Sequence, residues 1–511
     1  MILDPKTYAD KLRGCILGKN IGGTLGGPLE CKQSVLDVDF YVHDITKGVL
    51  PNDDLDLQIA FLCAAEKYGV GVNSRILGGY WNTYIVPDWA EYGFGKRNLR
   101  AGLVPPLSGY YQNIYGESNG AWIRSELWAC LAPGRPDIAV RYAYEDASVD
   151  HFGCGVYAEM FTAALESAAF ATSDPEKAID VALSYIPPDC DIAKVVAFVR
   201  ACKDDPTIDW KAARKKVLIA FPSSFGRDTL PGQSFDPDIP LPDHRKDSPA
   251  GIGITLIGHY YGGGDFSRAL CIAAGCCDDS DCTAGTLGAF YGILYGTAGI
   301  PEKWIAPIGD EIKTCSLDTT KPGIPTTVTE MCERIARLMP VFMENYLHRD
   351  EEGRFSVEMR DENDLRAPKV AAYYWGVEEK KAPLYTLYPA DGLTMRQDSG
   401  GAMAFVRLSS LNIHEGEPWD CTAWITYYGC SAFGSGHTNR YTVTVHVPAE
   451  WEAPNGRTFI IDQPADTVQM ETETYTFIPR DLRSPTTPVL VEFREIGGPD
   501  CLCFPVVLFH R

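Results

Sequence analysis

The sequence predicts a protein of two parts: an all-helical domain over residues 1–345, followed by an antiparallel β-sandwich-like domain over residues 346–511. Before about residue 340, apolar residues recur at helical spacing. After about residue 350, short β-branched and aromatic runs take their place. Hydrophobic residues make up 45% of the chain and charged residues 22%. This is ordinary globular composition, and a chain of 511 residues can bury a large core.

The helical prediction rests on segments whose apolar residues share one face and which Asp-Pro breaks separate. These segments are Ile59–Lys67, Glu159–Ala171, Asp191–Cys202, Trp210–Ala220, Phe266–Cys276 and Thr329–Asn345. Between them, the stretch Trp89–Tyr115 is rich in Gly, Tyr and Pro. We expect it to form a long irregular loop, and loops of that length in compact domains are often functional.

The β prediction rests on runs that are bounded by Pro, Gly and Asp, several of which alternate between apolar and polar residues. The runs are Thr442–Val447, Thr458–Ile461, Thr474–Ile478 and Val489–Phe493. Short strands separated by turn residues are typical of an antiparallel sandwich.

Charge and chain ends exclude several classes of function. Lys and Arg number 46 against 68 Asp and Glu, a net charge of −22. Such an acidic surface argues against nucleic acid and against anionic membranes as partners. The N-terminus has no apolar signal region and no run of 18 apolar residues occurs, so we expect no membrane span and a cytoplasmic location.

The 17 cysteines are scattered through apolar runs, as reduced, buried cysteines are. The close pairs, Cys276–Cys277 and Cys501–Cys503, do not combine into a zinc-ligand spacing.

Two acidic clusters each precede an apolar helical segment. The first contains Asn52, Asp53 and Asp54, and the second runs from Asp278 to Thr283. Carboxylates beside amide or hydroxyl oxygens are ligands for hard cations such as Mg²⁺. The same residue types also cap helix N-termini, so both interpretations stand for either cluster alone.

Glycines recur at helical spacing in two segments of the chain. Gly14, Gly18, Gly22 and Gly26 lead to Glu30, and Gly285, Gly288, Gly292 and Gly296 follow the second acidic cluster. Several glycines in one helix are costly unless another helix approaches closely. We therefore expect tight helix packing, with these helices framing a site.

His151 precedes a helical segment, and Arg124 lies two residues before Glu126. Each has a structural interpretation, as a cap, a core residue or an ion pair. Each is also a candidate for contact with a substrate.

Together these pieces resemble the ADP-ribosylglycohydrolase family, which includes the J1 crystallins, over roughly residues 10–300. The resemblance rests on four motifs: Gly14–Glu30, Asn52-Asp53-Asp54, Asp150-His151 and Asp279–Thr283. It implies an all-helical domain with a cleft that holds two Mg²⁺ ions. It also implies hydrolysis at the anomeric carbon of a ribose, releasing ADP-ribose from a protein or a small molecule.

Carried over residue by residue, the resemblance assigns roles to this sequence. Asn52, Asp53 and Asp54 match a metal-binding Thr-Asp-Asp triplet, and Asp279 and Asp281 match the aspartates of an Asp-x-Asp-Thr run. Glu30 matches an active-site acid. The predicted metal ligands are therefore Asn52, Asp53, Asp54, Asp279, Asp281 and Thr283, with Mg²⁺ as the expected ion and Mn²⁺ or Ca²⁺ as alternatives. The predicted catalytic residues are Glu30, Asp54 and Asp279, and the predicted substrate contacts are His151, Arg124 and Glu126.

Three departures from the family pattern bear on these roles. Asn52 stands where the family has Thr, Gly23 where an Asp is common, and Cys282 where many members have a ligating Thr. A thiol is a poor Mg²⁺ ligand, so Thr283, one residue later, is the alternative.

The sequence thus leads to three hypotheses about function. The first is a Mg²⁺-dependent hydrolase of a small-molecule or protein-attached ADP-ribosyl group. The second keeps the chemistry but acts on a furanoside without a nucleotide, since the Tyr-rich stretch Trp89–Tyr115 suits sugar rings. The third is a non-catalytic binding or structural protein of crystallin type, against which the retained aspartates argue.

Overall fold

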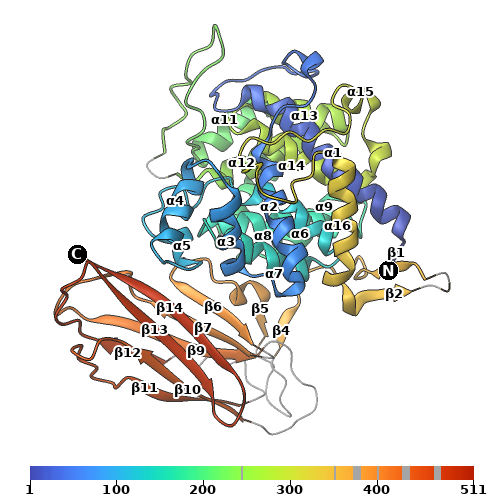
Figure 1. Cartoon of the computed structure of the whole chain (residues 1–511). Helices are drawn as coiled ribbons and strands as arrows, with labels where there is room; N and C mark the ends of the chain where they lie inside the picture. Colours follow the sequence, from blue (N-terminus) through green and yellow to red (C-terminus); the bar gives the residue numbers. More distant parts are fainter. Residues whose placement is uncertain are drawn as a thin grey trace. The chain divides into compact units, whose positions relative to one another are not determined.

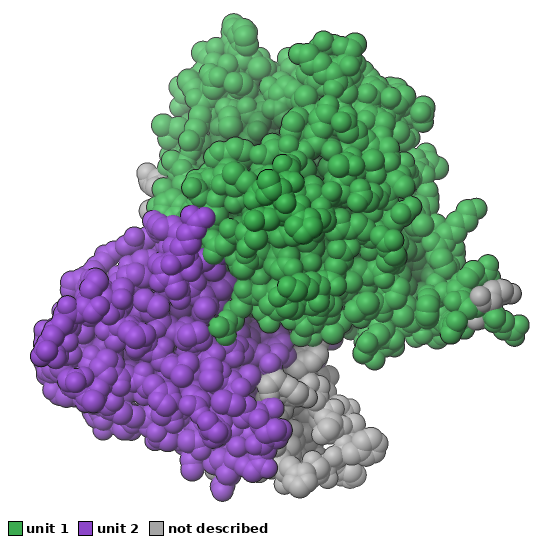
Figure 2. Space-filling model, in the orientation of Figure 1, with its two compact units in different colours: residues 1–96, 113–367 green, residues 97–112, 368–511 purple. Residues whose placement is uncertain are grey.

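The computed structural model describes residues 1–242, 245–349, 351, 353–371, 381–399, 402–427, 438–464 and 473–511 (Figure 1). These residues form two compact units, coloured separately in Figure 2. Unit 1 consists of residues 1–96 and 113–367, and unit 2 of residues 97–112 and 368–511. The predicted order, a helical domain followed by a region rich in strands, is confirmed.

Unit 1 is built mainly of helices. They are α1 (Pro5–Gly26), α2 (Asp53–Tyr68), α3 (Ser74–Tyr84), the first part of α4 (Ala90–Arg100), α6 (Glu126–Leu131), α7 (Pro136–Ala147), α8 (Cys154–Ala169), α9 (Pro175–Leu183), α10 (Asp191–Asp204), α11 (Trp210–Ala220), α12 (Asp247–Gly262), α13 (Phe266–Gly275), α14 (Ser280–Tyr295), α15 (Glu302–Ile305) and α16 (Val328–Phe342). A small antiparallel sheet of β1 (Ile2–Leu3), β3 (Phe355–Glu358) and β2 (Leu347–Arg349) completes the unit. Every helical segment predicted from apolar spacing overlaps one of these helices, although three of the predictions run one to three residues past the helix end.

The core of unit 1 is organised around α14. Its residues from Ser280 to Leu294 are all buried. It packs against α1, α13, α12 and α8 (Figure 1). A helix that is apolar on every side belongs in the interior of a large domain. The N-terminal end of α14 therefore lies inside the unit, where the acidic residues that precede it are shielded from water.

The expectation of an irregular loop over Trp89–Tyr115 is wrong. The stretch contains α4 and the short helix α5 (Leu107–Tyr110). The backbone of α4 approaches Asp150 closely at Gly95, because a Cβ at residue 95 would lie 2.9 Å from Cβ of Asp150. Gly95 thus allows a helix to approach its neighbour, and this tertiary contact cannot be read from local composition.

Unit 2 contains the remaining strands: β4 (Lys369–Ala371), β5 (Lys381–Pro383), β6 (Thr394–Ser399), β7 (Ala402–Leu408), β8 (Asn412–Ile413), β9 (Trp419–Tyr427), β10 (Thr438–His446), β11 (Thr458–Pro464), β12 (Glu473–Phe477), β13 (Thr486–Glu495) and β14 (Cys501–His510). One sheet has the order β11-β10-β13-β14-β8 and another the order β12-β9-β7-β6. Neighbouring strands in both sheets are antiparallel, except that β8 pairs in parallel with β14.

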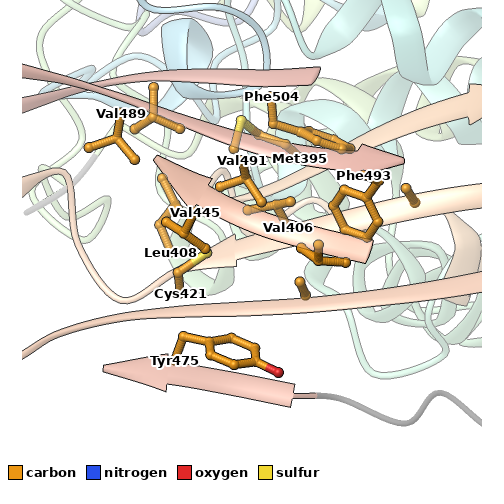
Figure 3. Close-up of a cluster of buried hydrophobic side chains, with 14 of the residues drawn as sticks. Met395, Val406, Leu408, Cys421, Val445, Tyr475, Val489, Val491, Phe493 and Phe504 are labelled. Atoms are coloured by element: carbon orange, nitrogen blue, oxygen red, sulfur yellow. The ribbon is translucent and has the colours of Figure 1, made fainter. Parts of the chain in front are cut away.

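Both sheets contribute to one apolar core, part of which Figure 3 shows. Alternate residues of β13, among them Val489, Val491 and Phe493, are buried, as the period of two in a strand requires. Leu103 and Leu107 from the segment 97–112 belong to the same core. This segment therefore folds with the C-terminal strands, although it is far from them in sequence.

The expectation of reduced cysteines agrees with the structure, since each cysteine in the described part of the chain is free. Among the described helices, none is both long and apolar enough to cross a bilayer.

Candidate metal centre

The glycine repeats of α1 and α14 face each other. A Cβ at Gly18 would overlap the backbone carbonyl of Gly288, and a Cβ at Gly14 would overlap that of Gly292. Without side chains at these positions, the two backbones come into direct contact. The C-terminal end of α1 consequently meets the N-terminal end of α14, where the Ser280 hydroxyl donates to the carbonyl of Gly26 at 2.8 Å.

The chain just beyond α1 is bonded to the chain just before α14. The Cys31 amide donates to the Asp278 carbonyl at 2.7 Å, and the Asp278 amide donates to the Lys32 carbonyl at 2.9 Å. Cys31, Cys277 and Asp278 have φ values of 62°, 57° and 68°. Such left-handed residues are costly and persist where surrounding contacts hold them. This bonding brings Glu30 close to Asp279 and Asp281.

Asp281 lies at the centre of the resulting carboxylate cluster. One group of potential ligand atoms comes from Glu30, Asp279 and Asp281, and a second from Asp54, Asp281 and Cys282. Within each group the atoms lie within 4.8 Å of one another. Asp281 therefore belongs to both groups, and the structure brings together residues from α2, α14 and the segment after α1.

Two oxygens of this cluster have neither a hydrogen-bond partner nor an ion-pair partner among the described residues. They are Oδ1 of Asp279 and Oδ1 of Asp281, both buried. The other Asp279 oxygen accepts a hydrogen bond from Nδ2 of Asn119 at 2.6 Å. A buried carboxylate oxygen without a partner is costly. Both oxygens are therefore open to a ligand that the polypeptide itself does not supply.

Burial and mutual repulsion shift the acids of the cluster toward their neutral forms. Burial, and then the charge of Asp53, raise the pKa of Glu30 to about 7. Burial, and then Asp54, raise the pKa of Asp53 to about 6. Burial, with Glu30 as the next cause, raises the pKa values of Asp279 and Asp281 well above their usual range. A bound cation would reverse these shifts by favouring the charged forms.

Asn52 and Asp53 lie at the start of α2. Asn52 is the N-cap, and its Oδ1 accepts from the Asp54 amide at 2.8 Å. Its buried Nδ2 has no partner among the described residues. Oδ2 of Asp53 accepts from the hydroxyl of Tyr92 at 2.7 Å. Thus the capping interpretation holds for Asn52, while Asp54, two residues later, reaches the cluster.

Cys282 and Thr283 lie in different surroundings. The Thr283 hydroxyl donates to the Ser280 carbonyl, one turn back on α14, at 3.3 Å. The Cys282 thiol lies 3.5 Å from Oδ1 of Asp54 and is a member of the cluster. Burial raises the pKa of this thiol well above its usual range, so the protonated form faces the carboxylates.

The predicted substrate contacts lie in the interior of unit 1. Arg124 donates to Asp146 at 2.6 Å and to Asp150 at 2.7 Å, and Nδ1 of His151 lies 2.9 Å from the same Asp150. None of these side chains has exposed surface. Burial by itself would raise the pKa of Asp150, but Arg124 and then His151 outweigh it and hold the pKa at about 2.

Glu126, the third predicted contact, is also enclosed. It accepts from Nε2 of Gln58 at 2.8 Å and pairs with Lys19 at 2.9 Å. Its prediction as a substrate contact, like those of Arg124 and His151, stays a prediction.

Sequence reasoning missed three residues that contact predicted metal ligands. Lys19 pairs with Asp54, Asn119 donates to Asp279, and Tyr92 donates to Asp53. Lys19 carried a usable signal, because a lone lysine among glycines and apolar residues in a buried helix needs a counter-charge. Asn119 and Tyr92 carried none, since polar residues of these types are common on surfaces and in loops.

Comparison with known proteins identifies the class and then the family. Residues 4–342 match the family model described as ADP-ribosylglycohydrolase, which places the chain among the glycosyl hydrolases. Because the match covers well over half of the sequence, the chain belongs to the ADP-ribosylglycohydrolase family. The search of curated proteins found no match. One solved structure, titled "ADP-ribosylglycohydrolase-related protein complex", is 16% identical and has a TM-score of 0.39; the alignment covers 66% of this chain and 98% of that one.

Proposed function

We propose that this chain is a hydrolase, dependent on a divalent cation, that cleaves the bond at the anomeric carbon of the ribose in an ADP-ribosyl group. Family membership supports the reaction class. The observation that carries the cation requirement is the pair of buried, unpartnered oxygens on Asp279 and Asp281. Mg²⁺ is the first candidate, with Mn²⁺ and Ca²⁺ as alternatives, because the ligand atoms are carboxylate oxygens.

The residues present fit such a cation. Glu30, Asp279 and Asp281 offer carboxylates within reach of one point, and Asp53 and Asp54 add negative charge beside them. When bound, the cation orients hydroxyl groups of the sugar and lowers the pKa of a water molecule. The ligand roles of Asn52 and Thr283 find less support, since their side-chain oxygens serve helix hydrogen bonds.

Glu30 is the candidate general acid or base. Its pKa is about 7 without a cation, and a bound cation would lower this value, so that Glu30 would act first as a base near neutral pH. Cleavage at an anomeric carbon passes through a state with positive charge on the sugar, which nearby carboxylates stabilise. We assign that stabilising role to Asp54 and Asp279.

For Arg124 and His151 we propose a positioning role. Arg124 donates to the carbonyl of Gly120 at 2.9 Å, and Nε2 of His151 lies 3.3 Å from the hydroxyl of Ser118. Asn119 lies between Ser118 and Gly120 in the sequence, and its side chain donates a hydrogen bond to Asp279. The buried ion pairs thus fix the segment 118–120 and, through it, the orientation of one carboxylate.

A furanoside without a nucleotide is the second candidate substrate. Trp89 is 53% exposed, and its ring centroid lies 6.3 Å from that of Tyr92, which bonds to Asp53. The exposed ring of Trp89 lies beside the tyrosine that bonds to Asp53. Such an aromatic face suits a sugar ring, and equally an adenine. The choice between the two substrates therefore needs a measurement.

The experiment is a hydrolysis screen of the full chain in Mg²⁺, with EDTA as the control. The panel contains ADP-ribosyl-arginine, ADP-ribosyl-serine, O-acetyl-ADP-ribose and aryl furanosides. Release from the ADP-ribosyl substrates, lost in EDTA, supports the proposal. Release from furanosides alone would favour the second candidate, and full activity in EDTA would contradict the cation requirement.

A further inference from the structure

Lys19 is a fully buried cation beside the carboxylate cluster. Its Nζ lies 3.0 Å from Oδ2 of Asp54 and 2.9 Å from Oε1 of Glu126, and none of the three side chains has exposed surface. It also donates to the hydroxyl of Thr286 at 3.0 Å. Lysine is almost never fully buried unless it is paired. The ammonium group is therefore a fixed positive charge of the interior.

The packing of α1 against α14 leaves room for this side chain. A Cβ at Gly285 would lie 3.2 Å from Cδ of Lys19 and 3.4 Å from Oδ2 of Asp54. Because residue 285 has no side chain, the lysine stem passes across α14 and delivers its charge to Asp54. The pair is thus enclosed by the helix interface itself.

The two ligand groups that share Asp281 differ in what they can offer a cation. The group of Glu30, Asp279 and Asp281 contains three carboxylates and both of the unpartnered oxygens. In the other group, Asp54 is already engaged on both oxygens, by Lys19 at 3.0 Å and by the thiol of Cys282 at 3.5 Å. Of the other two members of that group, Asp281 is shared with the first group, and Cys282 is a poor ligand for a hard cation.

We propose that the centre binds one divalent cation, on Glu30, Asp279 and Asp281, and that the Lys19 ammonium supplies at Asp54 the positive charge of a second. This inference rests on the proposed cation dependence and narrows the number of ions that the family resemblance implies. A second dication at Asp54 would either displace the ammonium or lie against it, where low dielectric makes like charges repel strongly. Lys19 is accordingly a positioning residue, which holds Asp54 toward α1.

The number of bound ions tests this directly, without any substrate. Mn²⁺ bound to the full chain is counted by electron paramagnetic resonance and by titration calorimetry. We expect one ion for the unchanged protein and two for Lys19→Met, which frees Asp54 and Glu126. The matched control is Lys11→Met, also on α1, whose Nζ donates to the carbonyls of Ala169 and Ile293 rather than to an acid. We expect this control to bind one ion.

Two ions of similar affinity in the unchanged protein would overturn the proposal, and so would a single ion in folded Lys19→Met. If Lys19→Met does not fold, Asp54→Asn takes its place. Asp54→Asn removes a carboxylate from the group of Asp54, Asp281 and Cys282. The variant should still bind one Mn²⁺ ion, with its affinity changed less than ~10-fold (about 1.4 kcal/mol). Loss of the ion would place Asp54 among its ligands and overturn the proposal. A protein that binds one ion but hydrolyses nothing would refute only the proposed function.

Discussion

Asn52 occupies the space that a side chain at residue 23 would need. A Cβ built on Gly23 would overlap Nδ2 of Asn52, the N-cap of α2. These are two of the positions at which the sequence departs from the pattern of the family it resembles. The structure shows that the two departures are linked, because the amide at residue 52 requires the absence of a side chain at residue 23.

This relationship predicts a non-additive pair of substitutions. Gly23→Ala should destabilise the protein by about 1–3 kcal/mol, as overpacking does. Asn52→Ser keeps a capping oxygen and removes the clashing nitrogen, so it alone should cost under about 1 kcal/mol. In the Asn52→Ser background, Gly23→Ala should lose most of its cost. Urea unfolding of the four proteins measures the coupling, and an equal cost in both backgrounds would contradict it.

The interface between α1 and α14 predicts that Gly18→Ala is severely destabilising. The new Cβ would meet the backbone of Gly288, which cannot move without separating the two helices. The control is Gly79→Ala on α3, where nothing lies within 4 Å of a Cβ. That substitution should be neutral or stabilise by up to about 1 kcal/mol. Melting temperatures of the two variants test the contrast, and a harmless Gly18→Ala would refute the close contact.

Asp281 belongs to both ligand groups, so Asp281→Asn should abolish cation binding and turnover while the fold persists. Loss of a group that stabilises the transition state typically costs at least ~10²-fold in rate. The control is Asp204→Asn, which changes an exposed acid at the end of α10. Calorimetric titration with Mn²⁺ and the hydrolysis screen provide two readouts. Normal Mn²⁺ affinity in Asp281→Asn would remove this residue from the centre.

The buried carboxyl group of Glu91 should make the stability of the protein depend on pH. This side chain is 6% exposed, and burial, opposed by His151, raises its pKa from 4.5 to about 7. Between these values the folded chain keeps a proton that the unfolded chain has lost, so stability falls as the pH rises from 4.5 to 7. The full change corresponds to about 3 kcal/mol. Glu91→Gln should lack this fall. Melting curves from pH 5 to 8 compare the two proteins, and identical slopes would contradict the prediction.

Much of the fold follows from the sequence because local patterns encode it. Apolar spacing identified the helices Asp191–Asp204 and Trp210–Ala220 almost to the residue. The strand prediction over Val489–Phe493 lies within β13. The prediction failed over Trp89–Tyr115, where glycines signalled a loop. There Gly95 lies in close contact with Asp150, and local composition contains no record of that tertiary contact.

For the site, the sequence by itself pointed to the acids: Asp54, Asp279 and Asp281 stand in the two acidic clusters, and the family resemblance adds Glu30. Only the tertiary structure decided how they are arranged. It placed Asp281 in both ligand groups, bonded the Thr283 hydroxyl to its own helix, and set Cys282 and Lys19 against Asp54. The physical reason is that a motif specifies neighbours along one chain segment. Distances, burial and charge pairing arise between segments that only the packing of α1, α2 and α14 brings together.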